Sequence, residues 1–288
     1  MNLSIAGLAI LLITAPAFAA PDDMDDAHQA LKEAVQAKKD AAEVKKLAAQ
    51  AYALAHPLAT SPESEDLKDA IAHAREVETY TEYALYVTAL QGPAEATVDL
   101  LSTLEQQNPK SKYLDEGYGR YFLALNQTGA ASKILGIAEK ALTSLPNNPD
   151  LLMVLADSAL TRKQFDRAVS YGQRLVAAAG EHKRNAMLGR GHYIAGVASA
   201  ASASPKWAVA DKELRAALPF IKDSEEMTGN ALFYLGLANY QLGKMTLKKA
   251  QMLEAVKFSE QAAGMKCSTA QQAFKNARLM KLEADKMR

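Results

Sequence analysis

Methionine is concentrated near the end of the chain, where its thioether groups could bind a soft metal ion such as Cu(I). Half of the ten methionines lie in the last 44 positions: Met245, Met252, Met265, Met280 and Met287. Met245 and Met252 are seven positions apart, as are Met280 and Met287, which is the spacing of one helix face. The same spacing fits methionines that fill a core or a partner groove. Both packing and a soft-metal or small-ligand site therefore stay open for these helices.

The motifs that usually carry catalysis or bind cofactors are missing from the sequence. It contains no His-Glu-x-x-His, Cys-x-x-Cys, Gly-x-Ser-x-Gly or Ser-x-x-Lys pattern. None of the five histidines has a His or Cys four positions later, as a helical metal site would need. Cys267 is the single cysteine, so it is either a buried thiol or an exposed one that pairs with another chain. We expect no cofactor and no metal site, and we do not expect an enzyme.

Composition and charge limit the class of protein further. The 288 residues include 33 basic and 33 acidic side chains, and 49% are hydrophobic, which is too apolar for a disordered chain. The net charge of zero argues against nucleic-acid binding, because phosphate contacts need a basic excess. Alanine is abundant and helix breakers are few, with 15 Gly and 10 Pro, so an all-α fold is expected.

The first 19 residues have the features of a secretory signal peptide. An uncharged apolar run ends in Ala17-Phe18-Ala19, the small-residue pattern that precedes a cleavage site. A membrane anchor is the alternative, but Pro16 interrupts the run and four aspartates follow within residues 22–26. We therefore expect cleavage after Ala19 and an exported, periplasmic chain.

Helical periodicity fills the chain after residue 20. Apolar residues recur at i, i+3, i+4 and i+7 in segments that Gly, Pro and Asn clusters separate. These segments predict about twelve helices, the first over 25–55 and others over 94–107 and 165–179. No segment alternates as a strand would.

Several of these segments fit an internal period of 34 residues. A unit that starts at residue 149 has small and apolar residues at the required places: Leu155, Ala156 and Ala159 on its first helix, Phe165-Asp166 at the turn and Ala168 on its second helix. In the segment 231–244, Gly236 would let the paired helix approach closely because it has no side chain. Linkers such as Asn108-Pro109 and the Pro-Asn run over 146–150 would close one unit and open the next.

With these residues the chain resembles tetratricopeptide repeat proteins over residues 78–266. The resemblance implies an α-solenoid of antiparallel helix pairs that forms a right-handed superhelix. Residues 20–77 would then be an N-terminal helical capping segment, and residues 267–288 a C-terminal capping helix.

The first helices of such a superhelix line a concave surface that suits an extended peptide or a partner helix. The resemblance places ten residues on that surface: Asp150, Met153, Asp157, Arg190, Tyr193, Val197, Asn230, Phe233, Leu237 and Tyr240. Many such positions can instead contact the adjacent unit or solvent. The expected function is a non-catalytic interaction scaffold of the cell envelope with a protein or peptide partner. A small-ligand or soft-metal protein that uses the Met-rich helices is the alternative.

Two surface patterns complete the sequence-based expectations. Tyr80, Tyr83 and Tyr86 recur on one face of a helix, where they either pack against the next helix or form an aromatic anchor in a ligand groove. From residue 244 onward, ten basic residues stand against four acidic ones, which indicates either a solvated helix face or peripheral contact with an anionic membrane surface or envelope polymer.

Overall fold

The computed structural model describes residues 21–287, and these residues divide into two compact units with the boundary after Leu114. The predicted signal peptide lies outside the described residues. Within residues 21–287 every regular element is a helix, either an α-helix or a short 3-10 turn. No helix in this range is both long enough and apolar enough to cross a lipid bilayer.

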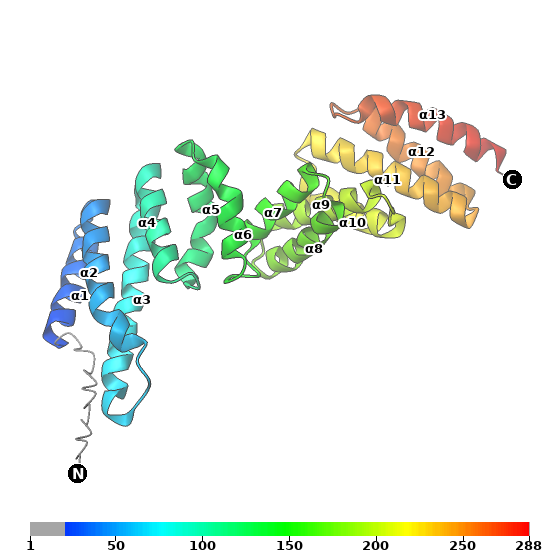
Figure 1. The fold of residues 1–288 in the computed structure, drawn as a ribbon. Helices are drawn as coiled ribbons and strands as arrows, with labels where there is room; N and C mark the ends of the chain where they lie inside the picture. Colours follow the sequence, from blue (N-terminus) through cyan, green and yellow to red (C-terminus); the bar gives the residue numbers. More distant parts are fainter. Residues whose placement is uncertain (1–20, 288) are drawn as a thin grey trace, which may run out of the picture. The chain divides into compact units, whose positions relative to one another are not determined.

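Unit 1 is a row of helices in which α1 to α4 each pack on the next. Its elements are α1 (Pro21–Gln36), α2 (Ala41–Ala59), η1 (Glu65–Leu67), α3 (Lys68–Gln91), α4 (Ala94–Gln107) and the first residues of α5 (Lys112–Gln127). α2 packs on both α1 and α3, and α3 packs on α4 (Figure 1). α1 also contacts α3, so the first helices of these two pairs lie side by side.

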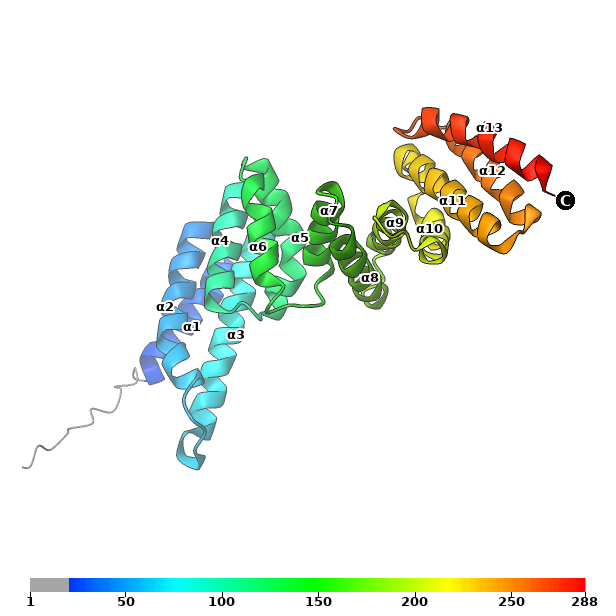
Figure 2. The same ribbon diagram turned by 45° about the vertical axis from the view of Figure 1, so that its right-hand side comes forward.

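Unit 2 continues the same pattern. After the rest of α5 come η2 (Ala131–Lys133), α6 (Ile134–Ala141), α7 (Pro149–Thr161), α8 (Phe165–Glu181), α9 (Asn185–Ala201), α10 (Trp207–Ile221), α11 (Glu225–Thr246), α12 (Lys249–Ala263) and α13 (Ala270–Lys286). From α6 to α13 each helix packs on the next, and α9 contacts α7 and α11 while α11 contacts α13. We call α7, α9, α11 and α13 the first helices of unit 2; Figure 2 shows this succession from a second side.

These arrangements confirm the predicted all-α fold of pairwise packed helices. Helix starts also follow the expected spacing loosely: α7, α9 and α11 start at residues 149, 185 and 225, so successive first helices begin 36 and 40 residues apart instead of 34. The longer of these two steps contains the extended connection between α9 and α10.

The single helix predicted over 25–55 is wrong, because the chain breaks into α1 and α2. Lys38 adopts a left-handed backbone conformation with φ of 51°, which cannot continue a helix. Asp40 then opens α2, since its carboxylate accepts a hydrogen bond from the backbone N of Glu43 at 2.9 Å. An Asp followed three residues later by Glu is a helix-start signal, so the break could have been read from the sequence.

The linker before α7 fixes the start of this helix. Asn148 caps α7 by accepting a hydrogen bond from the backbone N of Leu151 at 2.9 Å, and Pro149 occupies the first turn, where no backbone donor is needed. The side-chain amide of Asn148 also donates to the backbone oxygen and a carboxylate oxygen of Asp115, both at 2.7 Å.

Close helix approach at Gly236 is confirmed. A Cβ at this position of α11 would collide with Oγ of Ser259 on α12, so any larger residue would require the Ser259 side chain or the paired helices to shift. α8 and α9 cross in a similar way, because a Cβ at Gly172 would lie 3.0 Å from the backbone oxygen of Gly191. Alanine and glycine therefore set how tightly these pairs pack.

Candidate functional site

The ten residues predicted for the concave surface all lie on three consecutive first helices. α7 carries Asp150, Met153 and Asp157; α9 carries Arg190, Tyr193 and Val197; and α11 carries Asn230, Phe233, Leu237 and Tyr240. Since α9 contacts both α7 and α11, the structure brings the three groups onto neighbouring helices. We call the surface formed by the first helices of unit 2 the first-helix face.

Asp157 and Arg190 join α7 to α9 at the edge of this face. Nε and Nη2 of Arg190 donate to the same carboxylate oxygen of Asp157 at 2.8 and 2.6 Å. The guanidinium also lies 5.5 Å from the ring centroid of Tyr193, and its Nη1 is 2.7 Å from the sulfur of Met227 on α11. About a third of each charged side chain is exposed, so a ligand can reach the pair.

Asp150 forms a more enclosed ion pair. One of its carboxylate oxygens lies 2.6 Å from Nη1 of Arg184, and only 7% of the Asp150 side chain is exposed. Because Arg184 immediately precedes α9, this pair fastens the start of α9 to α7. Asp150 therefore has a structural role, because its ion pair links the helix pair that starts with α7 to the one that starts with α9.

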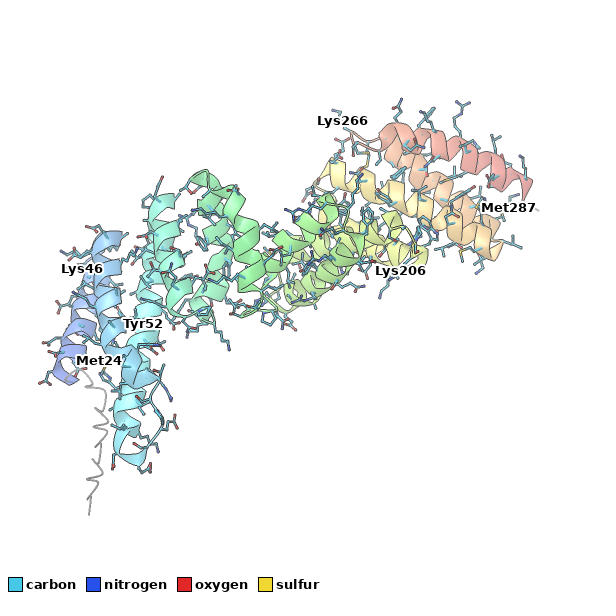
Figure 3. All side chains as sticks on the ribbon, in the orientation of Figure 1. Met24, Lys46, Tyr52, Lys206, Lys266 and Met287 are labelled. Carbon is cyan, nitrogen blue, oxygen red and sulfur yellow. The ribbon has the colours of Figure 1, made fainter. Side chains whose placement is uncertain are left out.

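Hydrogen bonds link α11 to the start of α13. Asn230 accepts from the hydroxyl of Thr269 at 2.7 Å and donates to Glu226 at 2.9 Å. The hydroxyl of Ser268 donates to Glu226 at 2.6 Å, and this bond is the main reason why the pKa of Glu226 is lowered. The loop that holds these hydroxyls contains Lys266 (Figure 3) and is thereby fixed against the N-terminus of α11.

Tyr240 ties the other end of α11 to α13. Its hydroxyl donates to Glu283 at 2.7 Å and accepts from Lys244 at 3.3 Å. Burial and the hydrogen bond to Glu283 raise the pKa of Tyr240, while Lys244 opposes the rise. The phenol thus stays a protonated donor in the neutral pH range.

Besides Asp150, three of the predicted residues have little access to solvent. Tyr193, Val197 and Phe233 are 6–8% exposed and belong to one core cluster with residues of α10 and α12. Burial is the main cause of the raised pKa of Tyr193, and its hydrogen bond with Asn230 opposes the shift. The other six predicted residues are half-buried and form the reachable part of the prediction: Met153, Asp157, Arg190, Asn230, Leu237 and Tyr240.

A hollow in unit 1 lies at the tyrosines that the sequence singled out. It has a volume of about 490 Å³ and is lined by Ala72, Arg75, Glu76, Thr79, Tyr80, Tyr83 and Tyr113. The ring centroids of Tyr80 and Tyr83 are 5.7 Å apart, and those of Tyr83 and Tyr113 are 5.8 Å apart. Tyr86 adds a fourth ring, 5.7 Å from Tyr113. The tyrosines therefore pack against a neighbouring helix and also form an aromatic surface that is accessible to solvent.

Sequence reasoning missed Tyr113 as a member of this group. Tyr113 follows the Asn108-Pro109 linker in the first turn of α5, so it lies one helix pair beyond α3. A tyrosine just after a linker of this kind could have been matched to the tyrosines of the preceding first helix. The spacing of residues on a single helix could not reveal it.

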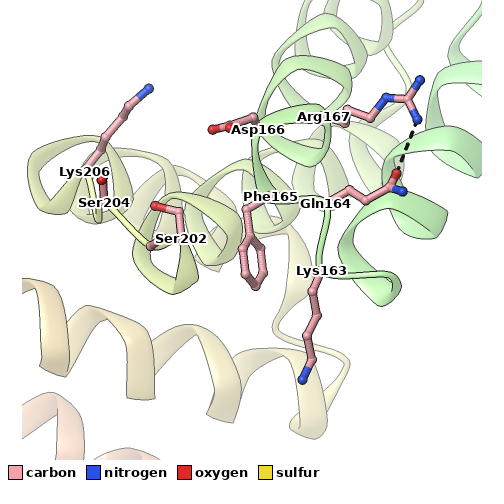
Figure 4. A pocket seen from close by; sticks show the side chains of 9 residues that line it. Lys163, Gln164, Phe165, Asp166, Arg167, Ser202, Ser204 and Lys206 are labelled. Carbon is pink, nitrogen blue, oxygen red and sulfur yellow. Dashed lines mark hydrogen bonds between the residues drawn. The ribbon is translucent and has the colours of Figure 1, made fainter.

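In a second hollow, where α8 and α10 begin, the basic side chains do not point toward a common site. It has a volume of about 460 Å³, and its lining includes Lys163, Arg167, Ser202, Ser204 and Lys206. The side chains of Lys163 and Lys206 point away from each other at opposite ends, and Arg167 is directed to Gln164, 3.4 Å away (Figure 4). The arrangement offers no point where the cations converge on an anion.

The methionines of the last helices are spread over different environments. Met252 and Met280 are 1% and 3% exposed, so packing is confirmed for these two, and the sulfur of Met280 lies 3.5 Å from the hydroxyl of Ser259. Met245 is 74% exposed, Met265 lies in the loop before α13, and Met287 follows the end of α13 (Figure 3). In residues 21–287 no group of three or more His, Cys, Asp or Glu side chains could hold a metal ion.

Comparison with known proteins assigns no relative to this chain: no protein-family model matches it, and no curated protein sequence matches it.

Proposed function

We propose that the protein is an exported, periplasmic scaffold of the tetratricopeptide type that binds a peptide or partner helix of another protein and performs no chemistry itself. Its binding surfaces are the first-helix face of unit 2 and the tyrosine hollow of unit 1. The partner is a protein, and the scaffold holds it through packing and hydrogen bonds.

One observation carries the proposal: first helices contact one another directly, so their side chains form a surface that continues from pair to pair. Asp157 with Arg190, and Tyr240 with Glu283, mark the contacts between successive first helices of unit 2. Such a surface suits an elongated partner, because one extended segment can touch several repeats at once.

The accessible residues on this surface are also of the kinds that bind protein segments. Met153 and Leu237 supply half-buried apolar area, Tyr240 supplies a ring with a polar tip, and Arg190 supplies a charge-assisted donor. Tyr and Arg are over-represented among the residues that dominate binding energy at interfaces, and Met adapts its shape to irregular partners.

Affinity purification from native cell envelopes tests the proposal. The tagged full chain is compared with a variant that carries Asp157→Ala and Leu237→Ala on the first-helix face, and with Leu253→Ala on α12 as a matched control. Leu253 is 46% exposed and lies on a second helix. We expect a discrete partner with the wild type and the control, and at least about tenfold less with the double variant, as for loss of residues central to binding. Equal recovery in all three would contradict the proposal.

A further inference from the structure

We propose that the tyrosine hollow of unit 1 binds a proline-rich segment in the polyproline II conformation, with acidic residues at its two ends. This inference rests on the proposed function, because it names the class of peptide that one surface of the scaffold would take. It is carried by the arrangement of the rings of Tyr80, Tyr83 and Tyr113 and by two lysines that flank them.

The rings form an uneven surface instead of a flat platform. Tyr80 and Tyr83 are inclined to each other by 53°, and Tyr83 and Tyr113 by 58°. Tyr83 contacts both neighbouring rings and has 38% of its surface exposed, so the inclined rings present an uneven hollow to solvent. A compact, rigid aliphatic ring such as that of proline fits a space of this shape.

The row of three rings suits one turn of a polyproline II helix. This conformation rises about 3.1 Å per residue and repeats every three residues, so one turn covers about 9 Å. The two successive ring separations, 5.7 and 5.8 Å, extend over a length comparable to one such turn. Aromatic grooves bind proline-rich segments in this way because the peptide is already extended and loses little entropy on binding.

A sugar chain fits this geometry less well. Stacking of sugar rings on aromatic side chains needs ring faces that are nearly coplanar along the chain. The inclinations of 53° and 58° do not provide such a platform. The same tyrosine hydroxyls, in contrast, can donate hydrogen bonds to the backbone carbonyls of a polyproline II segment, which are fully available because this conformation has no internal hydrogen bonds.

Charge at the two ends of the row indicates which flanking residues the segment would carry. The ammonium group of Lys32 lies 5.7 Å from the ring centroid of Tyr80, and that of Lys112 lies 4.9 Å from the ring centroid of Tyr113. Among the described residues 21–287, neither lysine has an ion-pair partner, whereas Arg75 on the rim is paired with Glu63 at 2.8 Å. Acidic side chains of a bound segment would complement the two unpaired lysines.

Binding of a designed peptide to the full chain tests the inference. The probe is a fluorescein-labelled peptide with six prolines between two aspartates, and the reference peptide replaces the prolines by alternating Gly and Ser. Fluorescence anisotropy is measured for the wild type, Tyr83→Ala, Tyr83→Phe and Phe274→Ala. Phe274 is a matched control because it is an exposed aromatic residue of unit 2, with 57% of its surface accessible.

We expect the proline peptide to bind at least about tenfold more tightly than the Gly-Ser peptide, and Tyr83→Ala to weaken it by at least about tenfold. Tyr83→Phe, which keeps the ring, and Phe274→Ala should retain most of the affinity. Replacing Lys32 and Lys112 together by Ala should weaken binding and reduce its salt dependence.

Equal affinity for both peptides, or no effect of Tyr83→Ala with the helical circular dichroism unchanged, would overturn the inference. So would binding of a soluble β-linked oligosaccharide that Tyr83→Ala abolishes while the proline peptide does not bind. In either case partner recovery that still depends on Asp157 and Leu237 would leave the proposed function intact, so the two failures are distinguishable.

Discussion

In unit 2, the burial of a single ion pair indicates whether it stabilises the fold or can be reached by a partner. Asp150 and Asp157 lie on the same helix, α7, and each pairs with an arginine of the next repeat. Their burial differs, since 7% of the Asp150 side chain and 37% of the Asp157 side chain are exposed. Sequence position alone gave both residues the same expected role.

The two aspartates should therefore respond differently to truncation. Asp150→Ala leaves Arg184 without its partner in a partly enclosed site and should cost about 1–3 kcal/mol of unfolding free energy. Asp157→Ala removes a pair at the solvent edge and should cost less than about 1 kcal/mol. Urea unfolding of the two variants checks this order. An equal or reversed loss would contradict the structural role assigned to Asp150.

His28 makes the stability of unit 1 dependent on pH. It is 9% exposed beside the ring of Tyr80, and its pKa is lowered, first by burial and then by Lys32 and His73, while Asp25 and Glu76 oppose the shift. Since its pKa in the folded state lies below the ordinary value of 6.5, the stability linked to neutral His28 is complete above pH 6.5 and is lost as the pH falls below that value.

We therefore expect His28→Phe to reduce the pH dependence of unfolding. Phenylalanine keeps an aromatic ring next to Tyr80 and has no proton to bind. Melting temperatures of wild type and variant, measured at pH 7.5 and 5.5, give the comparison. The fall in melting temperature between the two pH values should be smaller in the variant, whereas an equal or larger fall would contradict the role given to His28.

At the scale of helices, glycine contacts control how closely the paired helices approach. Gly236→Ala places a methyl group against Ser259 on α12 and should cost about 1–3 kcal/mol, as overpacking of a tight contact does. Gly180→Ala is the matched control, because a Cβ at this position of α8 meets no atom within 4 Å. It should be neutral or stabilise by up to about 1 kcal/mol.

Adding Ser259→Gly to Gly236→Ala should restore part of the lost stability, since it removes the atom that the new methyl group meets. Thermal unfolding of the single and double variants measures this coupling. Strictly additive effects would show that the contact between positions 236 and 259 does not limit the approach of α11 and α12.

Helix positions could be predicted well from the sequence, but their lateral contacts could not. The predicted spans 94–107 and 165–179 agree closely with α4 and α8, because breakers flank clear apolar periods. The site was harder to predict, because a repeat position on a first helix does not tell which neighbouring helices cover it. Phe233 is buried in a core cluster that includes residues of α10 and α12. The break at Lys38 was missed because the left-handed lysine itself carries no strong sequence signal, and the helix-start pattern of Asp40 and Glu43 was not used.

For the whole molecule, we expect an exported chain that begins after the signal peptide. Residues 1–19 should be absent from the protein isolated from cell envelopes, since Ala17-Phe18-Ala19 provides the cleavage pattern. Intact mass and N-terminal sequencing of the isolated protein check this expectation. A chain that retains residue 1 would indicate an uncleaved anchor instead.

Above all, we expect the first-helix face to be the surface that holds the partner. The most direct measurement is photo-crosslinking in native envelopes from a photoreactive residue at Leu237, with Leu253 on α12 as the control position. Leu237 is half-buried on α11 and reachable, whereas Tyr193 and Phe233 are too enclosed for this purpose. We expect a discrete protein adduct from position 237 and none from position 253. An adduct from position 253 alone, or none from either position in the folded, exported protein, would contradict the role of the first-helix face.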